Sequence, residues 1–379
     1  MKIGIITILK VNNYGAELQA YATQAALKKY GYDAEIIDYL YYKNKRHIRT
    51  KLSKPLFPMP LKKTLAEFIY PIISGIKRLY NFKQTSSREN RFQIFHQKNT
   101  SFSETYRTID SLYLNAINYD VYIAGSDQIW NPGTFSSLAP YFLDFAPEGK
   151  KRIAYASSFG VGIIPEYARE YYSTQLRKFH AIGVREENAV GLIKSLCGKE
   201  STWVLDPTLL LDKNEWRTVS SPVNNLPDQY ILIYELTRCK YIKNLALHFS
   251  KMLNLPIVRI CKDSVPEDKK TSVIQIADAG PGEFLTLFDK ADLIITNSFH
   301  GTAFSINFNK NFYTVIPDRK NNNDRQKSIL KLFGLKHLLL IENSAYPEQI
   351  PEIDFNTVNE ILKTERDKSI IFLTNAINH

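Results

Sequence analysis

A short turn in the second half of the chain carries residue types that can do chemistry. Residues 293–296 have the composition of a buried strand, and the run after Gly301 can form a helix. The turn between them, residues 297–301, contains His300. A turn from strand to helix lies at the carboxyl edge of an open α/β sheet, where such folds bind ligands, and the helix end attracts anions. His300 is therefore either a catalytic candidate or a hydrogen-bonded turn histidine.

A second polar loop also follows an expected strand, within residues 120–132. It combines the carboxylate of Asp127 with the amides of Gln128 and Asn131 and the indole of Trp130. Carboxylates and amides accept and donate hydrogen bonds to sugar hydroxyls, and a flat ring packs against the apolar face of a sugar. The loop therefore predicts a sugar-binding element, with the alternative that Asp127 caps a helix.

Arg185 lies at the carboxyl end of another expected strand, residues 181–184. A guanidinium at this edge of a sheet can bind a carboxylate or phosphate through two hydrogen bonds. The alternative is an ion pair with Glu186, Glu187 or another acid of the chain.

The elements that must position these side chains alternate between strands and helices. The first strand is expected at residues 2–9 and the first helix at residues 16–30. The turn between them, residues 12–15, lacks the G-x-G-x-x-G spacing, so a dinucleotide is disfavoured, and the sequence has no P-loop. A second α/β series starts near Tyr230 and ends in a long amphipathic pattern at residues 355–377. We therefore expect two open-sheet α/β domains facing each other across a cleft.

The composition is that of an ordinary globular protein, and 379 residues leave room for two domains. The three cysteines are far apart and form no C-x-x-C pair, which predicts a reducing compartment and no metal centre. The first strand follows Met1 without a signal-peptide pattern, and no stretch reaches the ~20 apolar residues that cross a bilayer. We therefore expect the protein in the cytosol.

The net charge of +11 is concentrated in one segment. Residues 43–98 contain fourteen lysines and arginines but only two acids, Glu67 and Glu89. Residues 61–80 add an amphipathic pattern with basic ends, which can lie in the headgroup region of an anionic membrane. The alternative is an insertion that packs its apolar face on the core. Nucleic acid is not expected, because no binding motif accompanies the charge.

Six motifs follow one another between residue 3 and about residue 335: N-N-Y-G-A-E-L-Q, G-S-D-Q-I-W-N, S-F-G, V-R-E-E, L-D-P-T-L-L-L and T-N-S-F-H-G-T-A. As an ordered set they resemble the polysaccharide pyruvyl transferase family. The resemblance implies a fold similar to GT-B glycosyltransferases, with two Rossmann-like domains and a last helix that crosses back to the first. It also implies phosphoenolpyruvate as donor and a sugar as acceptor, usually in bacterial surface polysaccharide assembly.

The resemblance assigns roles to residues that match the motifs by position. His300 matches the family's proposed catalytic histidine, and Arg185 matches an arginine proposed to bind the donor. Better-studied members have an arginine where this chain has Ser298, two residues before the histidine. We expect Arg325 to supply the missing charge, with Ser298 and the helix end at Gly301 completing the donor site.

On the acceptor side, Asp127 is expected to orient or deprotonate a sugar hydroxyl. No cofactor is expected beyond phosphoenolpyruvate as co-substrate, and no metal. A lipid-linked acceptor would lie at the inner face of the cytoplasmic membrane. The basic segment, residues 43–98, could then bind the protein peripherally to that membrane. The expected acceptor-binding residues are Asn13, Tyr14, Gln128, Trp130 and Asn131.

Two other functions share parts of this pattern. A GT-B glycosyltransferase that uses a nucleotide sugar would have the same fold and sugar-binding loop, but would release a nucleotide. A non-catalytic sugar-binding member of the assembly machinery would consume no phosphoenolpyruvate. The expected domains are residues 1–220 on the acceptor side, with the basic insertion at about 41–100, residues 221–354 on the donor side, and a helix at 355–379 packing back on the first domain.

Overall fold

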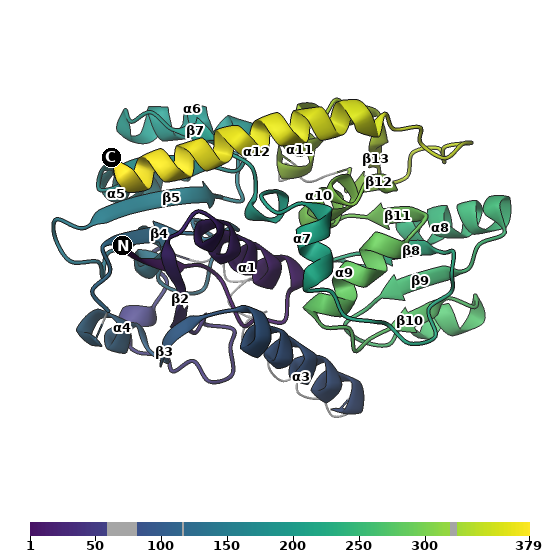
Figure 1. Ribbon diagram of the computed structural model, residues 1–379, viewed down its shortest axis with the longest axis horizontal. Helices are drawn as coiled ribbons and strands as arrows, with labels where there is room; N and C mark the ends of the chain where they lie inside the picture. Colours follow the sequence, from purple (N-terminus) through teal and green to yellow (C-terminus); the bar gives the residue numbers. More distant parts are fainter. Residues whose placement is uncertain (59–81, 116, 319–323) are drawn as a thin grey trace. The chain divides into compact units, whose positions relative to one another are not determined.

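Two parallel β-sheets, one in each of two units, make up the fold (Figure 1). The computed structural model describes residues 1–58, 82–115, 117–318 and 324–379. The first unit comprises Met1–Glu67, Asn99–Leu210 and Lys363–His379, and the second comprises Phe68–Lys98 and Leu211–Leu362. These bounds differ from the expected domains, because residues 82–98, 211–220 and 355–362 belong to the second unit.

The first unit contains a seven-stranded sheet in the order β3-β2-β1-β4-β5-β6-β7, parallel throughout. The strand order runs outward in both directions from the neighbouring strands β1 and β4. Their carboxyl ends therefore form a topological switch point, where open α/β sheets bind ligands. The strands are β1 (Lys2–Ile6), β2 (Asp33–Tyr39), β3 (Phe102–Tyr106), β4 (Val121–Ala124), β5 (Lys151–Ser157), β6 (Ala181–Val184) and β7 (Thr202–Trp203).

Helices cover both faces of this sheet, which explains why the central strands are almost wholly buried. On one face, α1 (Tyr14–Lys29) and the C-terminal part of α12 (Phe355–Asn378) pack against β1, β2, β4 and β5. On the other face, α4 (Ile109–Asn115), α5 (Glu166–Arg177) and α6 (Glu187–Cys197) join an aromatic-rich core. The switch point is thus held between two packed layers.

Helix α12 is joined to the first unit by polar contacts as well as packing. Lys151 Nζ donates to the carbonyl oxygen of Ile377 at 2.9 Å. The N–H of Leu205 donates to Ser369 Oγ at 2.9 Å. These contacts, with the buried Leu373, fix the last helix on the sheet face that α1 also covers.

The second unit repeats the arrangement with a six-stranded parallel sheet in the order β10-β9-β8-β11-β12-β13. Its switch point lies between β8 and β11. The two sheets confirm the expected α/β class with two Rossmann-like domains. The strands are β8 (Ile231–Tyr234), β9 (Ile257–Ile260), β10 (Ile274–Ile276), β11 (Leu293–Thr296), β12 (Asn311–Ile316) and β13 (Leu339–Ile341), and the helices are α3 (Phe82–Asn99), α7 (Lys213–Thr218), α8 (Lys240–Leu253), α9 (Pro281–Lys290), α10 (Phe299–Asn307) and α11 (Asp324–Leu332).

The basic segment lies partly within the described residues. The amphipathic pattern expected at residues 61–80 falls outside them. In α3, Arg88 Nη1 donates to a backbone carbonyl of the second unit at 3.1 Å, and Arg91 pairs with Asp278 at 2.9 Å and Glu283 at 3.6 Å. Two of the segment's basic side chains therefore make contacts within the second unit. No helix in the described part of the chain combines the length and the apolar character needed to cross a bilayer.

Candidate functional site

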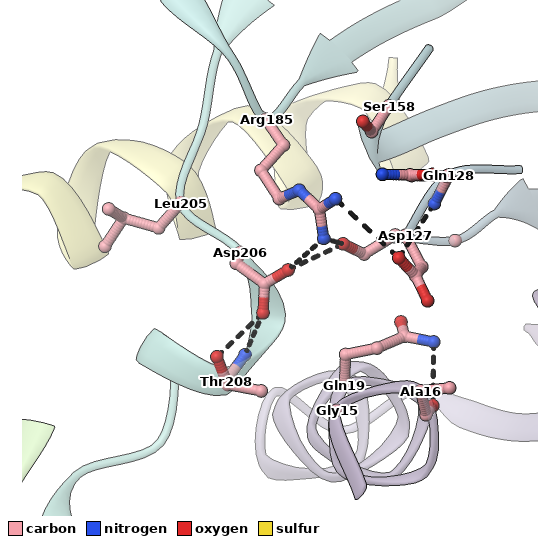
Figure 2. Close-up of polar contacts among 12 residues, drawn as sticks. Gly15, Ala16, Gln19, Asp127, Gln128, Ser158, Arg185, Leu205, Asp206 and Thr208 are labelled. Carbon is pink, nitrogen blue, oxygen red and sulfur yellow. Dashed lines mark hydrogen bonds and ion pairs between the residues drawn. The ribbon is translucent and has the colours of Figure 1, made fainter. Parts of the chain in front are cut away.

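The carboxyl edge of the first sheet brings several of the predicted polar residues together at its switch point. Asn13 follows β1, Asp127 follows β4 and Arg185 follows β6. Because parallel strands end at one edge, side chains that follow them can meet there. Figure 2 shows Asp127 and Arg185 facing each other, with the start of α1 beside them.

Arg185 is the buried centre of an ion network at this edge (Figure 2). Its side chain is only 1% exposed, and Nη1 donates to Asp206 at 3.0 Å and to Ser126 at 3.3 Å. Nε donates to Glu186 at 3.2 Å, and Nη2 lies 3.7 Å from Asp127 Oδ1. Burial lowers the pKa of Arg185, but the three carboxylates raise it by more, so the net pKa lies above its ordinary value. The guanidinium therefore stays charged.

This geometry confirms the ion-pair alternative for Arg185, with Glu186 as one partner. Three carboxylates surround a guanidinium that hardly reaches the surface, so a direct donor clamp is not the arrangement observed. Asp206 had not been expected in the site. It caps the 3-10 helix Pro207–Leu209 by accepting from the N–H of Thr208 at 3.0 Å. Its signals in the sequence are its place in the L-D-P-T-L-L-L motif and the Asp-Pro-Thr pattern, a typical helix start.

Asp127 presents one carboxylate oxygen to this network and the other toward α1 (Figure 2). Oδ1 accepts from the N–H of Gln128 at 2.9 Å and faces Arg185. The backbone of Asp127 has φ 73°, in the left-handed region that aspartate tolerates better than most residues. No helix begins in residues 128–138, so the helix-cap alternative for Asp127 is wrong.

The remaining residues of the polar loop do not share one environment. Asn131 Nδ2 donates to Gln128 Oε1 at 3.1 Å, so the two amides hold each other. Trp130 is fully buried, stacks on Phe142 with ring centroids 5.4 Å apart, and donates Nε1 to the carbonyl of Tyr141 at 3.0 Å. The expected role of Trp130 in sugar binding is therefore wrong, because its ring belongs to the hydrophobic core.

Asn13 and Tyr14 form the beginning of α1. Asn13 is the N-cap, with Oδ1 accepting from the N–H groups of Gly15 at 3.0 Å and Ala16 at 3.4 Å. The side chain of Tyr14 is buried. Asn13 thus fixes where α1 starts beside the switch point, and a contact between these two residues and an acceptor stays a prediction.

The switch point of the second unit holds the turn with His300. Ser298 is the N-cap of α10: its Oγ accepts from the N–H of Gly301 at 3.3 Å, and its own N–H donates to Thr296 Oγ1 at 3.0 Å. A Cβ on Gly301 would lie 2.3 Å from Thr296 Oγ1, so glycine allows α10 to approach β11 closely. The helix begins at Phe299, earlier than expected, and His300 lies in its first turn.

His300 is 6% exposed, and its ring stands edge-on to Phe299 with centroids 5.3 Å apart. Asn297, the residue before the N-cap of α10, is hydrogen-bonded to α11: its carbonyl accepts from Gln326 Nε2 at 3.3 Å. Arg325 directly precedes Gln326 in the first turn of α11, which packs on α10. The structure therefore brings the helix of Arg325 to the N-terminal end of α10.

The predicted residues thus form two groups of different chemistry, one in each unit. Acceptor oxygens and excess carboxylates dominate the first group, which suits neutral ligands that donate hydrogen bonds. The helix end dominates the second group, which suits an anion. Within the described residues, no three histidine, cysteine, aspartate or glutamate side chains gather to hold a metal ion.

Two doubly wound parallel sheets with polar residues at their switch points define a two-domain α/β protein of the Rossmann-like class. A family model described as "Polysaccharide pyruvyl transferase" matches residues 13–319. The chain therefore belongs to the polysaccharide pyruvyl transferase family. Among curated proteins there is no significant match.

Several solved structures resemble the chain at low sequence identity. UDP-N-acetylglucosamine 2-epimerase from Rickettsia bellii is 10% identical, with a TM-score of 0.49 over 100% of this chain and 97% of that one. UDP-GlcNAc 2-epimerase from Methanocaldococcus jannaschii is 11% identical, with a TM-score of 0.48 over 96% and 92%. The E. coli heptosyltransferase WaaC with ADP is 12% identical, with a TM-score of 0.41 over 96% and 100%. At these values the similarity carries no argument about substrate or reaction.

Proposed function

We propose that this protein transfers pyruvate from phosphoenolpyruvate to two hydroxyls of a sugar and so forms a pyruvyl ketal. Membership of the family indicates a transferase that acts on a polysaccharide. The observation that carries the proposal is the buried His300 in the first turn of α10, at a helix end that favours an anion.

In this proposal the donor binds at the switch point of the second unit. Phosphoenolpyruvate carries a carboxylate and a phosphate, and the N-terminal end of α10 attracts negative charge. Ser298 and Gly301 close the turn with small side chains. In this proposal Arg325, from the first turn of α11, supplies the cation that a serine at position 298 does not. Arg185 serves the acceptor side by holding Asp127.

The reaction balances in two steps. His300 donates a proton to the methylene carbon of the enol, and a sugar hydroxyl attacks the adjacent cationic carbon as Asp127 takes the hydroxyl proton. Phosphate then leaves that carbon with the electron pair of the broken C–O bond. A second hydroxyl attacks in its place and gives its proton to the departing phosphate. The proton held by Asp127 passes to solvent, from which His300 regains its own. The products are the ketal and inorganic phosphate. Proton transfer by a positioned side chain is worth roughly 10²- to 10⁴-fold in rate.

A lipid-linked acceptor would place this reaction at the inner face of the cytoplasmic membrane. The described start of the basic segment exposes Ile48, Leu52 and Leu56 by 47%, 53% and 41%. Six lysines and arginines lie within residues 43–54, around these apolar side chains. Interleaved apolar and cationic side chains bind anionic lipid surfaces, so peripheral membrane docking belongs to the proposal.

The test supplies the purified protein with phosphoenolpyruvate and a panel of sugar and lipid-linked sugar acceptors. We expect inorganic phosphate to be released as an acceptor gains the mass of one pyruvyl ketal. Release of a nucleotide from a nucleotide sugar, with phosphoenolpyruvate untouched, would instead identify a glycosyltransferase. Sugar binding without turnover of either donor would identify a non-catalytic protein.

A further inference from the structure

Gln19 is a buried polar residue of α1 that the mechanism above does not use. Its side chain has no exposed surface, at the switch point of the first sheet. Nε2 donates to Thr7 Oγ1 and to the carbonyl of Ala16, both at 2.9 Å. Among the described residues, Oε1 has no hydrogen-bond partner. A buried acceptor in this state calls for a donor from outside the chain.

The two atoms of the Gln19 amide cannot be exchanged. The carbonyl oxygen of Ala16 can only accept a hydrogen bond, so the atom that faces it has to be the NH₂ nitrogen. Oε1 must therefore point away from Ala16. Figure 2 shows it directed toward the carboxylate of Asp127.

Asp127 presents a second acceptor to the same place. Its Oδ1 is engaged by the N–H of Gln128 and faces Arg185. Its Oδ2 points toward Gln19, and no hydrogen bond from the described residues reaches it. Two acceptors cannot bond to each other, so a ligand that donates hydrogen bonds to both atoms would satisfy them.

The charge around this position decides which ligands fit. One guanidinium, that of Arg185, is shared by the carboxylates of Asp127, Glu186 and Asp206, which leaves excess negative charge. A phosphate or carboxylate would be repelled by that charge and by both acceptor oxygens. A neutral polyhydroxyl compound supplies O–H donors without adding charge.

We propose that Gln19 Oε1 and Asp127 Oδ2 together bind the two acceptor hydroxyls that the ketal joins. The identity of the ligand as a sugar diol rests on the proposed function. Ketal formation needs two neighbouring hydroxyls, and this site offers one neutral and one charged acceptor side by side. The hydroxyl at Asp127 can lose its proton and attack first, while Gln19 fixes the orientation of the second.

The test compares two glutamines of α1. Gln19→Met removes the amide at similar volume, and Gln24→Met is the matched control. Gln24 is equally buried, but its amide is fully paired with the carbonyls of Ala34 and Ser101 and the N–H of Ser101. The ligands are methyl hexopyranosides with free diols, each tested beside its O-methylated counterpart. Ligand-observed NMR without phosphoenolpyruvate follows their binding.

We expect free diols to bind to the unaltered protein and their O-methylated counterparts not to bind. Gln19→Met should weaken the affinity about ten-fold, which is roughly the effect of losing one hydrogen bond. Gln24→Met should change thermal stability and leave the affinity unchanged. Equal affinity for Gln19→Met and the unaltered protein overturns the proposal, and so does absence of binding by every free diol.

Asp127→Asn provides a second readout. The amide introduced at this position can donate a hydrogen bond to Gln19 Oε1, so the protein itself supplies the missing donor. We therefore expect diol binding to be lost while the protein stays folded. Diol binding at the original affinity would overturn the site. Failure of the proposed function looks different, since diols would then bind but no phosphoenolpyruvate would be consumed.

Discussion

At Arg185 a single buried guanidinium serves three carboxylates, and this predicts a large effect on stability. Arg185→Met leaves Asp127, Glu186 and Asp206 near one another without a counter-charge. Breaking a buried ion network by removing one partner typically costs ~3–5 kcal/mol. We therefore expect the free energy of unfolding, measured by urea titration, to fall by about that amount.

Arg217→Met is the matched control for this prediction. Arg217 also binds a carboxylate with two nitrogens, at 2.7 and 2.8 Å from Asp289, but its side chain is 48% exposed. Exposed pairs contribute ~0–1 kcal/mol. A loss no larger for Arg185→Met than for Arg217→Met would contradict the structural role and favour the donor clamp that the sequence predicts.

Position at a strand end identified part of the site from the sequence. Asp127 and His300 follow buried strands, so their place at a sheet edge could be predicted. The burial of each side chain could not be predicted. Trp130 follows the same strand as Asp127, yet its ring packs into the core. Gln19 is the last residue of the N-N-Y-G-A-E-L-Q motif, but the motif assigns it no role, because one glutamine in a helical run becomes informative only when its partners, Thr7 and Ala16, are known.

At the scale of elements, the buried strands β1 and β11 are predictable from the sequence. A short run of aliphatic residues indicates such a strand even when its neighbours in the sheet are not known. The sequence predicts a start for α10 that is too late, since glycine and histidine are poor helix formers and the helix begins directly after the N-cap Ser298. The sequence does not predict strand β3, because it is a largely exposed, polar edge strand.

The meeting of α10 and α11 makes Arg325 a donor-binding candidate that can be tested. Charge-assisted hydrogen bonds contribute ~1.5–3 kcal/mol, so Arg325→Ala should raise the KM for phosphoenolpyruvate roughly ten- to a hundred-fold. The KM for the acceptor should not change. Lys327→Ala, which removes an exposed cation from the same helix, is the control. Steady-state kinetics with an unaltered KM for phosphoenolpyruvate would remove Arg325 from the donor site.

At the scale of the whole molecule, the repeated α/β pattern was enough to predict two parallel sheets. The bounds of the two units were not predictable, because they depend on contacts between distant segments. Residues 82–98 belong to the second unit, where Arg91 of α3 pairs with Asp278 and Glu283. A charge count of the basic segment cannot reveal such partners.

The exposed apolar residues of the basic segment predict peripheral binding to anionic lipid. Replacing Ile48, Leu52 and Leu56 together by serine should reduce co-sedimentation with phosphatidylglycerol vesicles more than ten-fold, because each loses apolar area that would enter the interface. Leu114→Ser is the control, since Leu114 is 82% exposed on α4 of the first unit. Undiminished binding of the triple variant, or no binding of the unaltered protein at low salt, would contradict membrane docking.

The most direct measurement follows phosphate release and acceptor mass in parallel, with phosphoenolpyruvate as the donor, for the unaltered protein and for His300→Asn. We predict one phosphate for each pyruvyl ketal, a kcat lowered roughly 10²- to 10⁴-fold in His300→Asn, and normal turnover in the control His337→Asn, which alters an exposed histidine. Undiminished turnover by His300→Asn, or phosphate release with no mass gain on any sugar, would contradict ketal transfer at the N-terminal end of α10.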